Sequence, residues 1–433
     1  MSDETRYIYA DNAATTPLSP HALEAMMPYL TSTFGNPSGI HRVSREAAEA
    51  LGDLRSRLAG LLGARPGEVY LTSGGSESDN WVLRGAVQRF RDQAGAGVRP
   101  CVITSAIEHH AVLHCCDALE REGVEVVRLP VDERGFVRVA DLEDALSRAV
   151  DRIALVSIML ANNEVGTVQD IRALAACAHR FEAPFHTDAV QAVGHIPVSV
   201  EELGVEALSL SAHKFHGPHG VGALYLRESF SIPPLIVGGA QERGERAGTE
   251  NLAGAAGMVA ALEESCEGLD ERAERVASLR DRLVRAVLDG VDDVRVTGPW
   301  GDGDGARLAG PSHSATGART TDPGNGEGTA TETAAWRRLP SIASFICHDV
   351  DGELLMVLLD RTGVAAATGS ACATGSTEPS HVVQALGITD PRWNHGTLRL
   401  SLADDVSEQD IEDLCERVPR CIKRCRMLSG TVA

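Results

Sequence analysis

The 433-residue sequence lacks a long apolar run, a leader-like N-terminus and an excess of basic residues. Its longest apolar stretches, such as residues 153–160, are shorter than the roughly 20 residues that a membrane-spanning helix needs. The first 17 residues do not have the basic and apolar layout of a secretion signal. A formal net charge of −21 would repel a phosphate backbone. We therefore expect a cytoplasmic protein without direct nucleic-acid or membrane binding.

Aromatic residues make up only 4% of the chain, whereas ten cysteines are spread along it. Without a secretion signal, these cysteines indicate reduced thiols rather than a disulfide framework. Cys415, Cys421 and Cys425 lie close together in the sequence and could be considered as metal ligands. No fourth ligand with zinc-like spacing accompanies them, so packing within a C-terminal helix is favoured and no metal is expected.

Amphipathic helical patterns alternate with short apolar runs between residues 46 and 226. This alternation is typical of a parallel sheet with crossover helices, in which ligands bind at the carboxyl ends of the strands. The expected strands lie within residues 68–74, 101–105, 124–130, 153–159, 184–190, 207–213 and 221–227. The sequence therefore predicts an α/β fold whose large domain spans residues 18–262.

A second region follows the alanine-rich helical stretch after Asn251. Strand-like runs at residues 294–298, 341–348, 363–370 and 397–402 predict a smaller α+β domain made of residues 1–17 and 263–433. Residues 298–333 are rich in Gly, Thr, Ala and Asp and have almost no bulky apolar side chains. Such a segment buries too little to offset its ordering entropy, so we expect a disordered surface insertion, with a functional loop as the alternative.

Lysine is the scarcest charged residue, with only two copies, and one of them is Lys214 in the small, glycine-rich string SAHKFHGPHG. Asp188 ends another apolar run 26 residues upstream. A lysine that forms an imine and a carboxylate that pairs with a ring nitrogen are the combination that pyridoxal phosphate requires. Each residue alone would be read as a surface charge, but the two matched contexts together favour a cofactor site.

Other polar motifs also follow predicted strands. Gly74, Gly75 and Ser76 precede a helix that is expected to begin near Glu77, where free backbone N–H groups suit a phosphate; Ser211 is a plausible second donor. Alone this motif is weak, because a plain serine N-cap looks the same.

Three further positions complete the pattern. His109 and His110 follow the run CVITS and would singly be read as loop surface. Arg399 lies within an otherwise apolar strand and needs an anionic partner if it is buried. Cys372 lies among Ser, Ala, Gly and Thr, so we expect an exposed, mobile thiol rather than a core cysteine.

Across nearly its whole length the chain resembles the class I cysteine desulfurases, which are fold-type I pyridoxal phosphate enzymes. The resemblance is carried, in the order and approximate spacing of the family, by DNAATTP, GNPSGIHR, TSGGSESDN, EHHAVL, NNEVGTVQDI, HTDAVQ, SAHKFHGPHGVGALY, ERAGTEN, GSAC and LRLSL. Two departures are visible: Ser76 stands where many members have Thr, and the insertion at residues 298–333 is longer than usual.

The resemblance assigns a role to each matching residue. Lys214 would hold the cofactor, Asp188 would pair with the pyridine nitrogen, Gln191 would bind the ring oxygen and His109, rather than its neighbour His110, would stack on the ring. The phosphate would be bound by Gly75, Ser76, Ser211 and His213, and by Thr249 from the partner subunit of a homodimer. Asn163 and Arg399 would hold the substrate carboxylate, and Cys372 would accept the sulfur.

The activity implied is the removal of sulfur from L-cysteine, which gives L-alanine and a persulfide on Cys372. The sulfur would then pass to an acceptor protein in iron–sulfur cluster assembly or in a thiolation pathway. A selenocysteine lyase and an aminotransferase are alternatives on the same scaffold, although an aminotransferase needs no thiol. A non-catalytic docking platform is another, but the presence of Lys214, Asp188, His109 and Cys372 argues against it.

Overall fold

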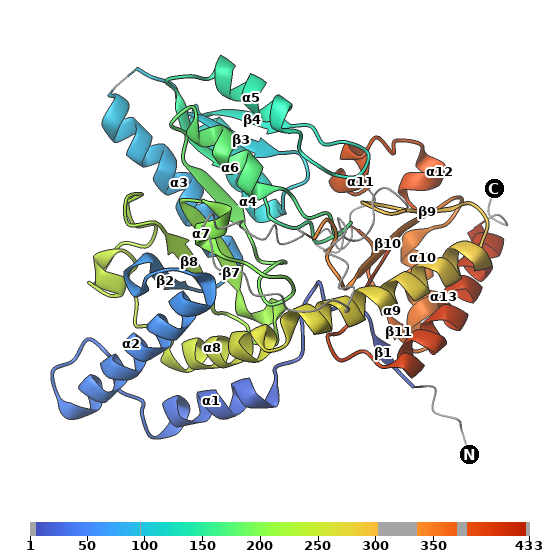
Figure 1. The fold of residues 1–433 in the computed structure, drawn as a ribbon, viewed down its shortest axis with the longest axis horizontal. Coiled ribbons are helices and arrows are strands. Elements are labelled where there is room, and N and C mark those ends of the chain that lie inside the picture. Colours follow the sequence, from blue (N-terminus) through green and yellow to red (C-terminus); the bar gives the residue numbers. More distant parts are fainter. Residues whose placement is uncertain (1–5, 96, 302–335, 370–378, 430–433) are drawn as a thin grey trace, which may run out of the picture.

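The computed structural model describes residues 6–95, 97–301, 336–369 and 379–429, and a seven-stranded sheet forms the centre of its larger part (Figure 1). The strand order is β2-β8-β7-β6-β5-β3-β4. The strands are β2 (Val69–Thr72), β3 (Cys101–Ser105), β4 (Glu125–Leu129), β5 (Ile153–Ser157), β6 (Phe185–Asp188), β7 (Ala207–Ser211) and β8 (Gly222–Leu226). Each lies within a run in which the sequence predicted a strand.

The sheet is mainly parallel, since β4, β3, β5, β6 and β7 all pair in parallel. Only β8 runs antiparallel to both of its neighbours, β7 and β2. The flanking helices are α1 (Pro20–Thr31), α2 (Arg42–Leu62), α3 (Gly75–Ala94), α4 (His110–Arg121), α5 (Val139–Arg148), α6 (Ile171–His179), α7 (Val200–Leu203) and α8 (Leu252–Cys266). Short 3-10 turns are η1 (Pro66–Glu68), η2 (Ala212–Lys214) and η3 (Glu242–Gly244). The predicted α/β fold class is confirmed.

Alternate side chains of the central strands enter two different apolar layers. On β5, Leu155 packs in the cluster that contains α3 and α4, whereas Val156 packs in the cluster that contains α2, α5, α6 and α8. On β7, Ala207 belongs to the first layer and Leu208 to the second. Both faces are therefore covered, which explains why these strands read as continuous apolar runs in the sequence.

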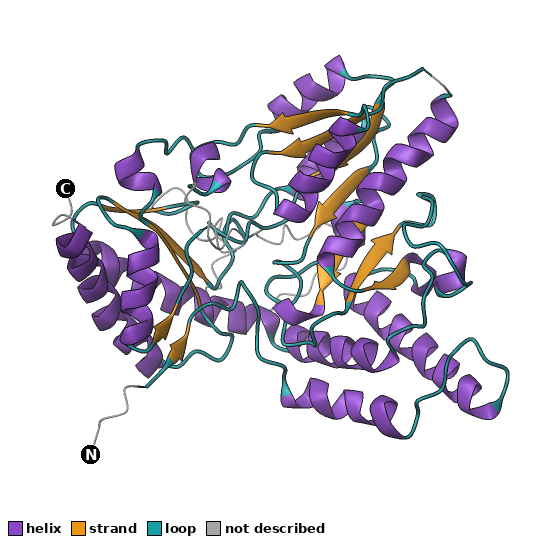
Figure 2. Ribbon diagram, turned by 180° about the vertical axis from the view of Figure 1, so that it is seen from behind, coloured by secondary structure: helices purple, strands orange, loops and turns teal. Residues whose placement is uncertain are grey.

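A second, antiparallel sheet of order β12-β10-β9 lies apart from the first, and Figure 2 shows the two groups of strands. It consists of β9 (Val294–Val296), β10 (Ile342–Cys347) and β12 (Thr397–Ser401), and a parallel pair is formed by β1 (Ile8–Tyr9) and β11 (Val364–Ala365). The helices of this part are α9 (Leu269–Gly290), α10 (Gly352–Arg361), α11 (His381–Ala385), α12 (Pro391–Asn394) and α13 (Glu408–Ser429). The long α9 connects the two parts of the molecule (Figure 1).

The cysteines of the C-terminal helix pack in the interior. Cys421 and Cys425 on α13 are buried in the apolar cluster that includes α9 and α10, and Cys415 packs against this cluster. The predicted packing role is therefore confirmed. The exact domain boundaries stay a prediction, and the predicted insertion falls almost entirely outside the described residues. Among the helices that the structure describes, none combines the length and apolarity of a membrane span.

Candidate functional site

A cavity of about 310 Å³ opens where the carboxyl ends of the parallel strands face the N-terminal segment and β12. The residues predicted from the sequence that line it are Gly75, Ser76, His109, Asn163, Asp188, Gln191, Ser211, His213, Lys214 and Arg399. They come from six separate stretches of the chain: the parallel sheet brings five of them to one edge, and β12 of the second sheet contributes Arg399. Ala13, Ala14, Asp79, Met159, Val190 and Gly369 complete the lining.

Lys214 ends the 3-10 turn η2, which follows directly after β7. Its Nζ donates hydrogen bonds to the backbone carbonyls of Ala13 at 2.7 Å and Ala14 at 2.8 Å. Gln191 donates its side-chain amide to the same Ala13 carbonyl at 2.9 Å. The N-terminal segment therefore holds the amine of Lys214 inside the cavity, a contact that the sequence analysis did not predict.

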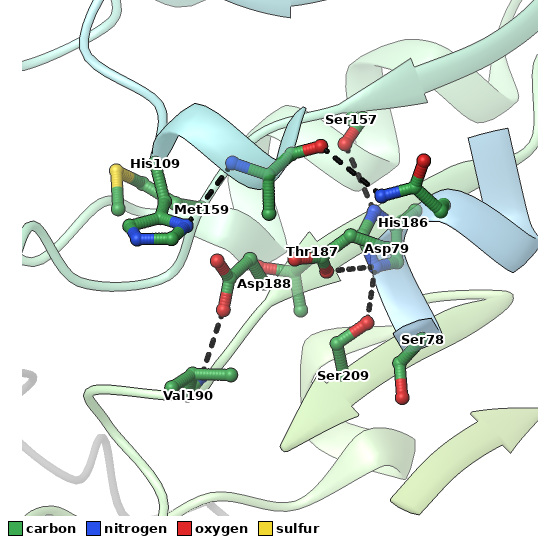
Figure 3. A network of polar contacts seen from close by, with 12 residues as sticks. Ser78, Asp79, His109, Ser157, Met159, His186, Thr187, Asp188, Val190 and Ser209 are labelled. Carbon is green, nitrogen blue, oxygen red and sulfur yellow. Dashed lines mark hydrogen bonds and ion pairs between the residues drawn. The ribbon is translucent and has the colours of Figure 1, made fainter. Parts of the chain in front are cut away.

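Asp188 is the last residue of β6 and is 4% exposed. Its carboxylate accepts a hydrogen bond from the backbone N–H of Val190 at 2.9 Å (Figure 3). Burial raises the pKa of Asp188 to about 6, and the nearby positive charge of Lys214 opposes that rise. A cationic ring nitrogen in the cavity would favour the ionised carboxylate further, so the group suits the predicted pairing.

A buried polar network lies behind Asp188, between the sheet and α3 (Figure 3). The ring of His186 bonds to the hydroxyl of Ser157 at 2.9 Å and to that of Ser209 at 3.0 Å, which links β5, β6 and β7. Burial lowers the pKa of His186 to about 3, so this ring is neutral. Asp79 of α3 lies 3.7 Å from the His186 ring, and burial together with the charge of Asp188 raises the pKa of Asp79 well above its usual value.

The sequence analysis missed this network because each member occurs singly within an apolar strand or helix. The signal in the sequence was one polar residue on each of three adjacent strands, namely Ser157, His186 and Ser209. Their side chains point to the side of the sheet that α3 covers. Burial and the charge of Asp188 both favour the protonated form of Asp79, which avoids two buried negative charges side by side. The network therefore favours a negative charge on Asp188 rather than on Asp79, as the predicted pairing with a ring nitrogen requires.

His109 is the N-cap of α4, and its Nδ1 accepts the backbone N–H of Ala111 at 3.1 Å. The proton of the neutral ring is therefore on Nε2. Burial and the charge of Lys214 lower the pKa of His109 to about 4, which keeps the ring neutral near pH 7. His110 does not line this cavity, so the structure favours His109 over its neighbour as the cavity-facing ring.

Glu108 is fully buried next to His109. Its carboxyl group accepts the hydroxyl proton of Ser105 and the backbone N–H of Met159. Burial raises the pKa of Glu108 to about 8. The sequence analysis did not identify this buried carboxyl.

The N-terminus of α3 forms another wall of the cavity, where Gly75 and Ser76 lie. Gly75 has no room for a side chain, because an added Cβ would lie 2.6 Å from Cγ2 of Val190. Gly74 precedes it with φ of 146°, a conformation that glycine favours, and it provides no side-chain cap for the helix. The first backbone N–H groups and Ser76 therefore face the cavity, as an anion site requires.

Arg399 lies on β12 and is 2% exposed. Its Nη2 pairs with Oδ1 of Asp11 at 2.6 Å, and its Nη1 donates to the carbonyl of Asn163 at 2.9 Å. The anionic partner that a buried arginine needs is therefore Asp11, which the sequence analysis did not identify. The Nε atom of Arg399 is buried without a hydrogen-bond partner within the described residues.

The described cavity lining does not test the predicted roles of Cys372 and Thr249. Cys372 falls within residues 370–378, which lie outside the described residues, although Gly369 lines the cavity. Thr249 is exposed and follows Arg246, which makes a two-pronged ion pair with Glu77 in the first turn of α3. Its predicted role belongs to a second subunit and stays a prediction.

Comparisons with known proteins agree with this geometry. The aminotransferase class-V family profile matches residues 8–304 and 326–414. The cysteine desulfurase IscS of Methanosarcina thermophila is 40% identical over 429 residues, which cover 99% of this chain and 95% of that protein. The IscS-like cysteine desulfurase of Mycobacterium tuberculosis is 40% identical over 419 residues, with 96% and 97% coverage.

Solved structures show the same fold. A NifS-like protein superposes with a TM-score of 0.80 at 32% identity and covers 96% of this chain and 100% of that protein. A structure described as SspA in complex with cysteine superposes with a TM-score of 0.70 at 28% identity, covering 91% of this chain and 98% of that one. The similarity therefore extends over both sheets.

Proposed function

The chain belongs to the class I cysteine desulfurases of the aminotransferase class-V family, and from this premise we propose how its cavity removes sulfur from L-cysteine. The products are L-alanine and a persulfide on Cys372. The observation that carries the assignment is that Lys214, Asp188, His109 and Arg399 line one cavity although up to 290 residues separate them in the sequence.

The cavity has the size and the donor set for pyridoxal phosphate. Its volume of about 310 Å³ suits a small cofactor. Lys214 would form the covalent link, Asp188 would face the ring nitrogen and Gln191 the ring oxygen. The phosphate would lie at the α3 N-terminus beside Ser76, and Ser211 and His213 line the same cavity. When bound, the cofactor supplies an electron sink for the bonds at the substrate Cα.

The residues around the substrate have separate tasks. Arg399 and Asn163 orient the substrate carboxylate, and the Nε of Arg399, which has no partner among the described residues, provides a donor for it. Lys214, released from the cofactor, moves the proton at the substrate Cα. The neutral His109 carries its hydrogen on Nε2 and donates it in a hydrogen bond towards the substrate sulfur, where it assists the proton transfers at that atom.

Cys372 takes the sulfur as a nucleophile. Its thiolate attacks the substrate sulfur, so that an S–S bond forms while the Cβ–S bond breaks. The electron pair left on the carbon side is protonated, and L-alanine leaves. No external oxidant is needed, because the substrate carbon is reduced as the sulfur is oxidised to the persulfide level. The persulfide then passes to an acceptor protein in iron–sulfur cluster assembly or thiolation.

We further propose a cytoplasmic homodimer. Leu23, Met27 and Leu30 of α1 lie on one helix face and are about half exposed. Phe34 and Ile40, which follow α1 in the sequence, have exposed fractions of 72% and 90%. An exposed apolar surface of this kind is typical of a protein interface. A second subunit on it would also be needed for Thr249 to reach a neighbouring phosphate site.

Lys214→Ala tests the cofactor site. Borohydride treatment of the purified protein should fix the mass of the cofactor to the peptide that contains Lys214, and the variant should lose this adduct and its activity. Lys423→Ala is the matched control, because Lys423 is the other lysine of the chain and is expected to leave both unchanged. An adduct on any other peptide would contradict the assignment of Lys214.

Cys372→Ser tests the sulfur transfer. The serine hydroxyl is too weak a nucleophile to take sulfur, whereas cofactor binding needs no thiol. The variant should therefore keep the cofactor spectrum and form essentially no alanine or sulfide from L-cysteine in the presence of a reductant. Retained activity towards selenocysteine alone would favour the selenocysteine lyase. Wild-type turnover of L-cysteine by the variant would disprove the persulfide mechanism.

A further inference from the structure

Asp404, just after β12, lies at the junction between the two parts of the molecule, behind the cavity wall that carries Lys214. Its carboxylate is 3.6 Å from Nδ1 of His195, 3.8 Å from Nε2 of His216 and 3.7 Å from Nε of Arg272. These three partners come from the turn after β6, the turn after η2 and the first turns of α9. One carboxylate thus connects three elements around the lysine-bearing turn.

Each of the two histidines has a second ring nitrogen that meets a backbone carbonyl. Nε2 of His195 lies 2.8 Å from the carbonyl oxygen of Lys214, and Nδ1 of His216 lies 3.1 Å from that of Pro17. Carbonyl and carboxylate oxygens only accept hydrogen bonds. The ring nitrogen beside each carbonyl therefore donates a hydrogen bond, and the other ring nitrogen lies within 4 Å of the Asp404 carboxylate, so each ring bridges Asp404 and a backbone carbonyl.

The two carbonyls belong to the segments that position the amine of Lys214. His216 has φ of 64°, a strained left-handed conformation for a residue other than glycine. Its N–H donates to the hydroxyl of Thr16 at 2.7 Å, and its carbonyl accepts the N–H of Ser19 at 2.9 Å. The turn after Lys214 is therefore joined to the same N-terminal segment whose carbonyls bind the Lys214 amine.

We propose that Asp404 is a positioning residue for Lys214, acting through His195 and His216. Asp404 does not line the cavity that contains Lys214 and does not touch the reacting atoms. It fixes the backbone on both sides of the lysine: the turn that carries it and the N-terminal segment that receives its amine. This inference rests on the proposed function of Lys214, but the ion-pair network itself can be measured separately.

The charges around the network agree with this role. The two histidines hold the pKa of Asp404 well below its usual range, and Asp404 raises the pKa of His216 against the effect of burial. Arg275 donates to the backbone carbonyl of Asp404. The neighbouring cavity that borders both Asp404 and His216 is also lined by the charged side chains Arg6, Glu264, Arg272, Asp405 and Asp410.

Because the pKa of His216 is raised, the network should stabilise the turn that carries Lys214 more at low pH than at high pH. The folded protein keeps the His216 proton above the pH at which the unfolded chain loses it. The stabilisation of the lysine turn is therefore complete at lower pH and is lost as the pH rises through the folded-state pKa of His216. Replacing Asp404 with asparagine should move this loss to lower pH.

The test compares full-length wild type with Asp404→Asn, Asp404→Glu and the control Asp405→Asn. Hydrogen exchange at the imidazole carbon, followed by mass spectrometry over a pH series, measures the pKa of His216 without any need for activity. Removal of a carboxylate within 4 Å should lower that pKa by about 1 to 3. Asp404→Glu keeps the charge and should stay close to wild type. Asp405 is exposed and contributes less than Asp404 to the His216 pKa, so Asp405→Asn should lower that pKa by less than Asp404→Asn does.

Steady-state turnover of L-cysteine and a pH titration of the cofactor absorbance complete the test. In Asp404→Asn, kcat should fall about 10- to 100-fold with KM unchanged, because the lysine is displaced while the carboxylate site is intact. The pH midpoint of the absorbance change should also move. Asp404→Glu should restore both.

The possible outcomes test the ion-pair network and the positioning role of Asp404 separately. An unchanged His216 pKa in Asp404→Asn overturns the ion-pair network. A changed His216 pKa with wild-type kcat and an unchanged absorbance titration overturns the positioning role. If wild type forms no alanine, the proposed function fails, and the absorbance titration alone then decides whether Asp404 positions Lys214.

Discussion

The assignment of Arg399 to the substrate carboxylate leads to a quantitative prediction for Arg399→Ala. In the structure two of the three guanidinium nitrogens are already occupied, by Asp11 at 2.6 Å and by the Asn163 carbonyl at 2.9 Å. The remaining Nε is buried without a partner in the part of the chain that the structure describes. A substrate carboxylate would therefore gain a charged hydrogen bond at Nε or would share the guanidinium with Asp11.

The expected loss in kcat/KM follows from the free energy that such a hydrogen bond contributes. A hydrogen bond to a charged group contributes about 1.5 to 3 kcal/mol. Because 1.4 kcal/mol corresponds to a factor of ten, kcat/KM for L-cysteine should fall about 10- to 150-fold. The variant also loses the ion pair with Asp11. Breaking a buried pair costs about 3 to 5 kcal/mol, and we expect about 2 to 3 kcal/mol here because the Asp11 side chain is 21% exposed.

A comparison of two substrates separates carboxylate binding from this structural loss. L-cysteine methyl ester has no free carboxylate, so its kcat/KM should fall only by the structural part of the effect. The ratio of kcat/KM for L-cysteine over the ester should therefore drop about 10- to 150-fold in the variant. Arg392→Ala is the control, because Arg392 forms an exposed pair with Asp390 in the same part of the molecule. An unchanged ratio in Arg399→Ala would refute the role of Arg399 in carboxylate binding.

Two further predictions concern stability and assembly. Burial raises the pKa of Glu108 from 4.5 to about 8, so the folded protein binds a proton that the unfolded chain has released, and the free energy of unfolding should fall as the pH rises from about 4.5 to 8. Glu108→Gln should flatten this slope in urea titrations, and equal slopes in both proteins would contradict the buried proton. The double variant Leu23→Asp, Met27→Asp should weaken the homodimer in light scattering, whereas the control Leu428→Asp, at an exposed apolar position on α13, should not. A wild type that is monomeric at working concentration would rule out a shared phosphate site.

The local pattern of the sequence determined the strands, the helices between them and the polar residues at the strand ends. A strand covered on both faces reads as a short apolar run, and a helix beside it shows the 3.6-residue period, so β5, β6 and β7 could be located without coordinates. The chemistry of Lys214 and Asp188 was also readable, because their motifs are specific. That they would meet followed from the rule that parallel strands end at one edge of the sheet.

The partners of these residues were decided by the tertiary structure alone. Arg399 pairs with Asp11, which is 388 residues away in the sequence, and Asp404 pairs with His195 and His216 from the other part of the molecule. The antiparallel direction of β8 also has no local signature. Periodicity specifies which face of an element is buried, but it does not specify which distant element covers that face. Partners across the junction depend on strand order and on the path of α9, and these form only when the whole chain packs.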